Sequence, residues 1–130
     1  MTTPYYIFPS FKETDKKFPI YVVTVGREIN APKTNRPNGI PNYQLLFTTK
    51  GSAEIVLGGE TITLKKNSVM YLKPNTPQYY YATGDWDTIW VTYNHNGSFE
   101  MLPVDNGIYN LPTIEPFVNI LNLMLKGRGT

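Results

Sequence analysis

The stretch SAEIVLGGETITL, residues 52–64, decides the fold class of this chain. Ala53, Ile55 and Leu57 alternate with other residues before the glycine pair, and the alternation resumes in ETITL after it. A period of two is that of a β-strand, and paired glycines suit the positive φ angles of a tight hairpin turn. The stretch therefore predicts a β-hairpin with one apolar face.

Turn signals of the same kind recur about every ten residues from Asn38 to Gly97, separated by short runs of strand composition. The predicted strands are PIYVVTV (19–25), NYQLLF (42–47), SAEIVL (52–57), ETITL (60–64), VMYL (69–72), QYYYA (78–82) and DTIWVTY (87–93). Turns are expected at Lys50–Gly51 and in ATGD, residues 82–85. Many short strands without a helical pattern between them predict an all-β sandwich or closed barrel up to about residue 112.

The pattern becomes helical near the end of the chain, with Thr113 as the expected N-cap and Gly127 as the terminator. Two interpretations of the helix are open: it packs on its own barrel, or it is shared with a second subunit. Its apolar residues in i, i+3, i+4, i+7 spacing are Ile114, Phe117, Val118, Leu121, Met124 and Leu125, and Ile120 and Leu123 widen the apolar arc. The chain thus divides into a barrel with an N-terminal arm, residues 1–112, and a helical segment, residues 113–130.

Composition narrows the class of protein. The chain has 130 residues, 41% hydrophobic and 17% charged, which is ordinary for one globular domain. A net charge of +2, with basic residues spread along the chain, predicts no nucleic-acid surface of its own. The absence of cysteine excludes a disulfide framework and a thiolate nucleophile. With no signal peptide or long apolar run, we expect a soluble cytoplasmic protein.

Residues suited to catalysis are few. The single histidine, His95, lies in YNHNGS, which predicts a solvated loop and cannot supply a metal site of several histidines. No serine lies in a Gly-x-Ser-x-Gly elbow. Asp85 and Asp87 are predicted in a turn and at a strand start, and Glu54 and Glu60 on the outer face beside the hairpin turn. The sequence therefore predicts a protein that is not an enzyme.

Aromatic residues dominate PNTPQYYYATGDWDTIWVTY, residues 74–93. In a strand, Thr88, Trp90 and Thr92 share one face, which combines an indole plane with hydroxyl groups. Apolar walls with a few polar groups are typical of small-molecule pockets, and aromatic planes suit sugar rings. Trp90 is open to two interpretations, as a core residue or as a platform for a ligand. Tyr80 shares a face with Gln78, and alternation alone does not tell whether that face is the interior.

The order of motifs from Asn35 to Gly97 resembles the N-terminal sensing and dimerisation domain of AraC-family transcription regulators. The shared features are an Arg-Pro-x-Gly entry, an aromatic-led strand ending at a glycine turn, and a hairpin with repeated glycines. They continue with a run from Leu64 to Pro74 in place of the family's L-x-x-G-D-x-x-x-x-x-P, a proline turn leading to the place of the family's His-x-Tyr, and a closing W-x-x-x-W-x-x-F/Y. The resemblance covers about half the chain. It implies a mostly β, cupin-type double-stranded β-helix, or jelly-roll, barrel with a C-terminal α-helix.

The resemblance also implies functional residues. Arg36, Tyr80 and Trp90 match effector-binding positions of the arabinose-responsive member, and Thr88 stands where that member has histidine. Gln78 stands where many relatives have histidine, and Asn67–Ser68 replaces a Gly-Asp turn, so no metal or other cofactor is expected. The predicted ligand-binding residues are Arg36, Gln78, Tyr80, Thr88 and Trp90.

The resemblance predicts an effector-sensing and dimerisation domain that binds a small molecule, expected to be a carbohydrate. The expected homodimer interface comprises Phe117, Leu121, Met124 and Leu125. DNA would be bound only through a helix-turn-helix domain that this chain does not contain. The segment from Met1 to Phe18 is either a lid over the pocket or a tail. Alternatives are a stand-alone carbohydrate-binding cupin and a metal-free cupin sugar isomerase or epimerase.

Overall fold

A computed structural model of the chain describes residues 5–7, 20–95 and 105–127. The described part is mostly β, as predicted, and ends in one helix. Its elements are β1 (Tyr5–Ile7), β2 (Ile20–Glu28), β3 (Thr34–Arg36), β4 (Tyr43–Leu57), β5 (Glu60–Lys65), β6 (Ser68–Leu72), β7 (Gln78–His95), β8 (Gly107–Asn110) and α1 (Glu115–Gly127).

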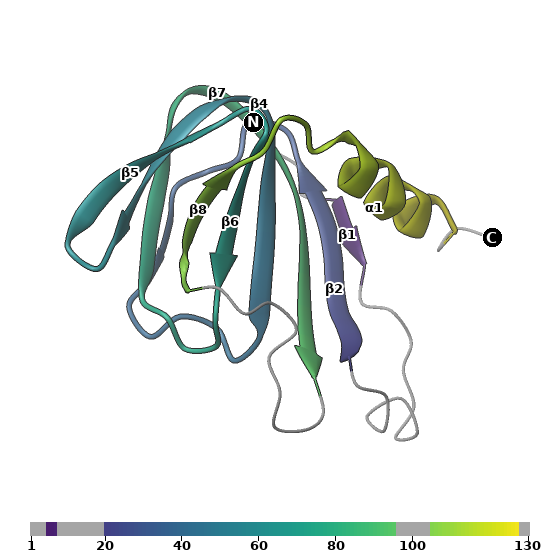
Figure 1. The fold of residues 1–130 in the computed structure, drawn as a ribbon, viewed down its shortest axis with the longest axis horizontal. Coiled ribbons are helices and arrows are strands. Elements are labelled where there is room, and N and C mark those ends of the chain that lie inside the picture. Colours follow the sequence, from purple (N-terminus) through teal and green to yellow (C-terminus); the bar gives the residue numbers. More distant parts are fainter. Residues whose placement is uncertain (1–4, 8–19, 96–104, 128–130) are drawn as a thin grey trace.

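The strands form one antiparallel sheet that curls on itself (Figure 1). Its hydrogen-bonded order is β1-β2-β7-β4-β6-β8, while β3 pairs with β7 and β5 pairs with β4. The long strands β4 and β7 lie side by side at the centre and pair along most of their length, from Tyr43 opposite Tyr93 to Val56 opposite Tyr79. Every other strand except β1 and β8 pairs directly with one of these two.

Two of the predicted turns are wrong, because β4 and β7 continue through them. At the first, Gly51 has a φ of 77°, and a Cβ there would lie 1.6 Å from the carbonyl oxygen of Asp85. The register between the two strands shifts on both sides of this contact. The close backbone approach, which only glycine permits, bends both strands together at a bulge, so the chain changes direction without reversing.

The predicted hairpin is confirmed between β4 and β5. Gly58 and Gly59 have φ angles of 59° and 83°, the positive values expected of the two central residues of a tight turn. The pairing of Ile55 with Ile62 places two apolar side chains opposite each other across the hairpin.

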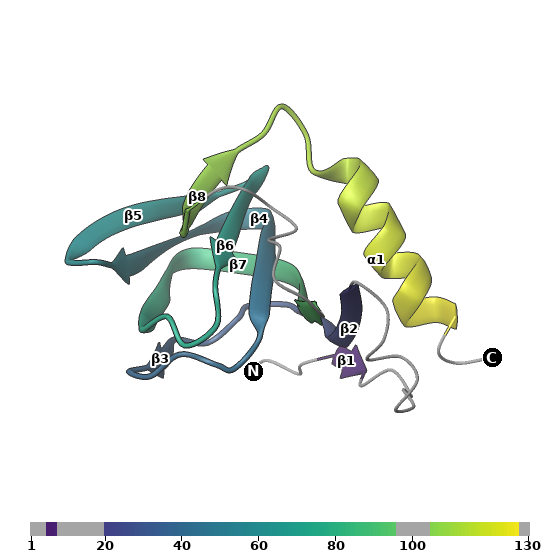
Figure 2. The ribbon, with the colours of Figure 1, turned by 60° about the horizontal axis from the view of Figure 1, so that its bottom comes forward.

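Apolar side chains gather on both sides of the curled sheet. The inner cluster lies within the curl and comprises Ala31, Leu46, Ala53, Ile55, Leu64, Met70, Leu72, Tyr80 and Trp86. The outer cluster lies between the sheet and α1 and comprises Val25, Phe47, Val69, Ile89, Val91, Ile114, Leu121 and Leu125. Figure 2 shows α1 alongside the outer surface of the sheet. The helix therefore covers one face of the strands whose other face encloses the interior.

The start of α1 is held to the sheet by the turn between β5 and β6. Asn67, whose φ is 71°, donates its N–H to the carbonyl oxygen of Thr48, and its Oδ1 accepts the N–H of Ile114. The hydroxyl of Thr113 accepts the N–H of Glu115, as expected of a capping residue. The predicted helix is thus confirmed, with a tether to the barrel that local pattern did not indicate.

Most of the N-terminal arm lies outside the described residues, whereas His95 lies within them. Of the segment from Met1 to Phe18, predicted as either a lid or a tail, only β1 belongs to the described residues, where it pairs with β2 at the edge of the sheet. The rest of that segment lies outside the described residues.

His95 is not in a loop as predicted: it ends β7 opposite Ile20, and its ring centroid lies 4.8 Å from that of Tyr43.

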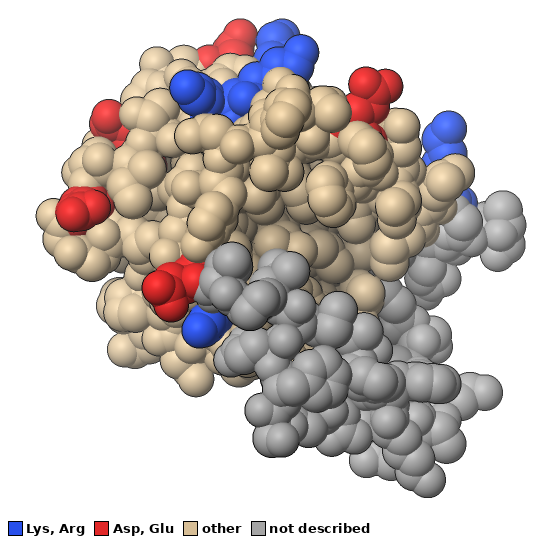
Figure 3. Space-filling view, viewed as in Figure 1, with Lys and Arg blue, Asp and Glu red and all other residues tan. Residues whose placement is uncertain are grey.

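Charged side chains form no basic stripe on the described part of the face in Figure 3, where both signs are scattered around the edge. Within the described residues, no helix is long and apolar enough to cross a membrane.

Candidate ligand-binding pocket

A pocket of about 430 Å³ lies between the inner faces of β2, β3, β4 and β7. That volume falls in the range of about 300–1,000 Å³ typical of small-molecule sites. Four of the five predicted ligand-binding residues, namely Arg36, Tyr80, Thr88 and Trp90, line it. The remaining lining residues are Val23, Thr24, Glu28, Ala31, Pro32, Thr34, Ile40, Pro41, Asn42, Gln44, Leu46, Trp86 and Thr92.

Arg36 is held by two neutral oxygens. Its Nη1 donates to Oε1 of Gln78 at 3.2 Å and to the hydroxyl of Tyr80 at 3.3 Å. This geometry follows from strand pairing, because Arg36 lies opposite Gln78 in the ladder between β3 and β7, and Thr34 lies opposite Tyr80. The guanidinium is therefore positioned in the pocket wall by β7.

Gln78, the fifth predicted ligand-binding residue, supports the pocket from behind. It is 3% exposed and is absent from the lining of the 430 Å³ pocket, while it does line a second, more open hollow between β3 and the β4–β5 hairpin. Its Nε2 donates to Oε1 of Gln44 at 3.2 Å. The amide thus joins Arg36 to Gln44, and both of those residues line the pocket.

Trp90 packs against the inner cluster and also lines the pocket. Its use as a platform for a ligand stays a prediction. Its position depends on Gly26, which lies directly opposite it on β2. A Cβ at Gly26 would lie 2.1 Å from Cζ2 of the indole. The indole can therefore lie over the backbone of β2 only because residue 26 has no side chain.

Trp86 fixes the other aromatic wall. It is fully buried, and its Nε1 donates to Oγ1 of Thr48 at 3.1 Å. The ring of Tyr80 meets Trp86 edge to face, with centroids 5.5 Å apart. This arrangement is a favoured one for aromatic pairs and restrains the phenol that contacts Arg36.

Hydroxyl groups line the pocket from the neighbouring strands β2 and β7. Thr88 lies on β7 with its side chain buried, and Thr92 lies further along the same face. The Oγ1 atoms of Thr92 and Thr24 are 2.6 Å apart, and the N–H of Thr24 donates to Thr92. The alternation of β7 had placed Thr92 beside Thr88 and Trp90.

Sequence reasoning missed Thr24, Glu28 and Gln44. Gln44 alternates with Leu46 and Thr48 along β4, so the inner face was readable as a pattern, but a glutamine at such a position is not an apolar core signal. Thr24 and Glu28 lie two and six residues along from Val22 on β2. No local motif marks them, and their role follows only from the pairing of β2 with β7.

The carboxylates considered for acid–base chemistry lie away from the pocket lining. Oδ1 of Asp87 accepts the N–H of Asn30. Glu54 accepts the hydroxyl of Tyr81 at 2.8 Å, and this hydrogen bond raises the pKa of that phenol. Glu28 is the carboxylate that lines the pocket among the described residues. No group of three or more His, Asp or Glu in that part of the chain is placed to hold a metal ion.

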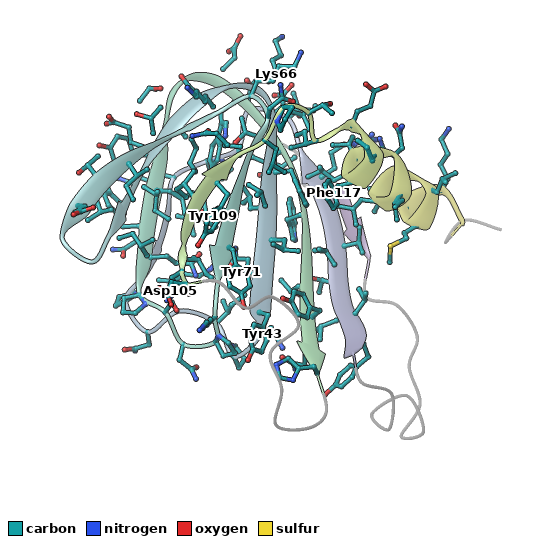
Figure 4. The ribbon with its side chains drawn as sticks, in the orientation of Figure 1. Tyr43, Lys66, Tyr71, Asp105, Tyr109 and Phe117 are labelled. Carbon is teal, nitrogen blue, oxygen red and sulfur yellow. The ribbon has the colours of Figure 1, made fainter. Side chains whose placement is uncertain are left out.

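The predicted interface residues are divided by the structure. Leu121 and Leu125, 6% and 3% exposed, belong to the outer cluster, and Met124 packs against it. Phe117 is 47% exposed and stacks on Phe47 with centroids 5.4 Å apart, on the side of α1 that faces the sheet (Figure 4). The most exposed apolar residues of the helix are Ile120 and Leu123, at 58% and 67%.

Several solved structures share this fold. The protein YhaK from Escherichia coli has a TM-score of 0.59 and 11% identity, over 85% of this chain and 52% of that one, so the chain spans about half of YhaK. A Cupin_2 domain of an XRE family transcriptional regulator from Enterobacter cloacae has a TM-score of 0.50 and 17% identity, over 75% and 98%. A cupin superfamily protein from Desulfitobacterium hafniense DCB-2 has a TM-score of 0.50 and 11% identity, over 69% and 76%.

These structural similarities confirm the predicted cupin-type fold. No curated protein sequence matches the chain. Residues 22–102, however, match the family described as the AraC-like ligand binding domain. The match spans more than half of the chain and takes in the four strands whose inner faces line the pocket. The chain therefore belongs to the AraC-like ligand binding domain family.

Proposed function

We propose that this domain senses a small-molecule effector of the carbohydrate class, bound in the 430 Å³ pocket. The observation that carries the proposal is the convergence there of an arginine fork, an indole plane and several hydroxyls. The C–H face of a sugar ring would lie against Trp90, and its hydroxyl groups would exchange hydrogen bonds with Arg36 and Thr88. Family membership supports ligand binding as the general role.

We propose binding rather than catalysis as the activity of the pocket. Proton transfer to or from a sugar carbon needs an acid and a base within hydrogen-bond reach of the substrate. The ionisable side chains lining the pocket among the described residues are Glu28, Arg36 and Tyr80, and Tyr80 already contacts Arg36. A bound sugar followed by NMR should remain unchanged over hours. Conversion to an isomer or epimer would make the domain an enzyme.

We further propose that the domain acts as a homodimer within a transcription regulator, with occupancy transmitted to a helix-turn-helix domain outside this chain. The proposed interface is the exposed apolar side of α1, formed by Ile120 and Leu123, with Phe117 and Met124 at its margin. Support comes from the exposure of these residues. Strand β7 supports a route for transmission, because it lines the pocket on one face and packs beneath α1 on the other.

The test of ligand class is a thermal-shift screen of the domain against neutral sugars and sugar acids. A ligand at a hundred times its Kd stabilises the folded state by about 2.7 kcal/mol, which raises the melting temperature by several degrees. Trp90→Ala should lose the shift, whereas Tyr79→Ala, which removes an aromatic ring outside the pocket lining, should retain it. A screen in which no sugar or sugar acid shifts the melting temperature would contradict the carbohydrate assignment.

A further inference from the structure

The charge of Arg36 has no carboxylate partner among the described residues. Both of its hydrogen bonds run from Nη1 to neutral oxygens, on Gln78 and Tyr80. Its Nη2 and Nε donate to no described group. A partly buried cation without a counterion is unfavourable, because burial removes water that would solvate the charge. Among the described residues, the pocket therefore contains an arginine charge that no carboxylate neutralises.

The neutral partners of Arg36 also fix its orientation. Gln78 and Gln44 are each 3% exposed and are hydrogen-bonded to each other, so the amide that accepts from Arg36 is itself held in place. Tyr80 is held by its edge-to-face contact with Trp86. A guanidinium positioned this way loses little further side-chain entropy when it binds a ligand. Its unused N–H groups match the two oxygens of a carboxylate.

Glu28 also lines the pocket but does not neutralise Arg36. Glu28 lies opposite Thr88 on β7, whereas Arg36 lies opposite Gln78 at the start of the same strand, with the bend near Gly51 between the two positions. No ion pair joins the two side chains, since the hydrogen bonds of Arg36 to described groups go only to Gln78 and Tyr80. Glu28 therefore leaves the charge of Arg36 without a counterion.

We infer that the effector carries a carboxylate that pairs with Arg36, so that the pocket selects an acidic sugar of the uronate type over its neutral counterpart. This inference rests on the proposed carbohydrate-binding function. The ring of such a ligand would occupy the same place against Trp90 as a neutral sugar. The difference lies in the acid group, which a guanidinium binds through paired, charge-assisted hydrogen bonds that a hydroxymethyl group cannot make.

The experiment compares matched ligands that differ only in the acid group: glucuronate with glucose, and galacturonate with galactose. Isothermal titration calorimetry at pH 7 and fixed ionic strength gives a Kd for each. At least one acid should bind about tenfold or more tightly than its neutral partner, the size expected for a charge-assisted bond. If an acid and its neutral partner bound equally well, and neither bound to Trp90→Ala, the inferred carboxylate preference would be overturned. The proposed carbohydrate-binding function would still stand. No binding by any of the four would overturn both.

Variants locate the preference. Arg36→Gln should reduce the ratio of the neutral sugar's Kd to the acid's Kd to about one. Arg36→Lys keeps the charge without the planar guanidinium fork, and it should retain part of the preference. Lys33→Gln removes the same charge from an exposed residue that does not line the pocket, and it should leave the preference unchanged. Unaltered melting temperatures and circular dichroism would show that the variants are folded. An equal loss in Lys33→Gln and Arg36→Gln would overturn the assignment to Arg36.

Discussion

The two faces of the second half of β7 carry different chemistry on consecutive residues. Thr88 and Trp90 face the pocket, where polar groups stay available and an indole is held by close approach to Gly26. Ile89 and Val91 face the outer cluster, where they are buried beneath α1. The outer face is used for packing against α1, whereas the inner face combines core packing with a pocket that offers polar groups to a ligand.

The largest expected effect is on the outer face. Ile89→Ala should lower the free energy of unfolding by about 2–5 kcal/mol, because it removes fully buried methyl groups and leaves a cavity. Urea denaturation measures the loss. Compared with Ile89→Ala, Trp90→Ala on the inner face should lower the free energy of unfolding less and weaken ligand binding more. If Ile89→Ala abolished ligand binding at temperatures where the variant is folded, stability and ligand binding could not be assigned to separate faces of β7.

The contact between Gly26 and Trp90 sharpens the comparison. Gly26→Ala should displace the indole toward the pocket, because the added Cβ and the ring cannot occupy the same space. We expect a loss of about 1–3 kcal/mol in stability from overpacking, together with weaker ligand binding. Gly84→Ala is the matched control, since a Cβ there meets nothing within 4 Å. Equal effects of the two alanines on affinity would contradict the proposed role of the contact.

A smaller effect on stability is expected at Thr48, which lies behind the Trp86 wall of the pocket. Thr48→Val removes the oxygen that accepts the Nε1–H of fully buried Trp86, and an unsatisfied buried donor should cost about 1–2 kcal/mol. Chemical denaturation of Thr48→Val, Trp86→Phe and the double variant forms a cycle that isolates this bond. A coupling energy close to zero would show that the hydrogen bond does not stabilise the pocket wall.

The smallest effect on stability is expected at the surface of α1. Ile120→Lys and Leu123→Lys should change the unfolding free energy by about 0.5 kcal/mol or less, as is usual for exposed sites. If the proposed interface is correct, they should nevertheless shift the domain toward the monomer in sedimentation velocity. Asn119→Lys adds the same charge at another exposed position of the helix. If the dimer persisted in Ile120→Lys and in Leu123→Lys, the interface would lie elsewhere on the domain.

Some features were predictable because they depend on nearby residues. Paired glycines between alternating strands predicted the β4–β5 turn, and helical spacing with Thr113 predicted α1. The turns predicted at Lys50–Gly51 and in residues 82–85 failed for a physical reason: a glycine that permits positive φ permits a bulge as readily as a reversal. Only the partner strand, with the carbonyl of Asp85 against Gly51, decides which of these forms.

The candidate site was predictable in part. The family resemblance indicated Arg36, Tyr80, Thr88 and Trp90, and the structure brings these residues to one pocket. Gln78 instead supports Arg36 from behind, which depends on the register between β3 and β7. Likewise, helical spacing showed that α1 has a wide apolar arc but not which part of it meets the sheet. Packing buries Leu121 and Leu125 and leaves Ile120 and Leu123 exposed.

By itself, the sequence determined the β-class of the fold, the hairpin, the helix and the alternation that separates Thr88 from Ile89, because these depend on residues near one another in the chain. Only the tertiary structure decided which face is the interior, how β4 and β7 bend together, and which groups surround Arg36. Gln78 and Tyr80 are distant from Arg36 in sequence and reach it only through antiparallel pairing. Strand register, which no local pattern specifies, therefore sets the chemistry of the pocket.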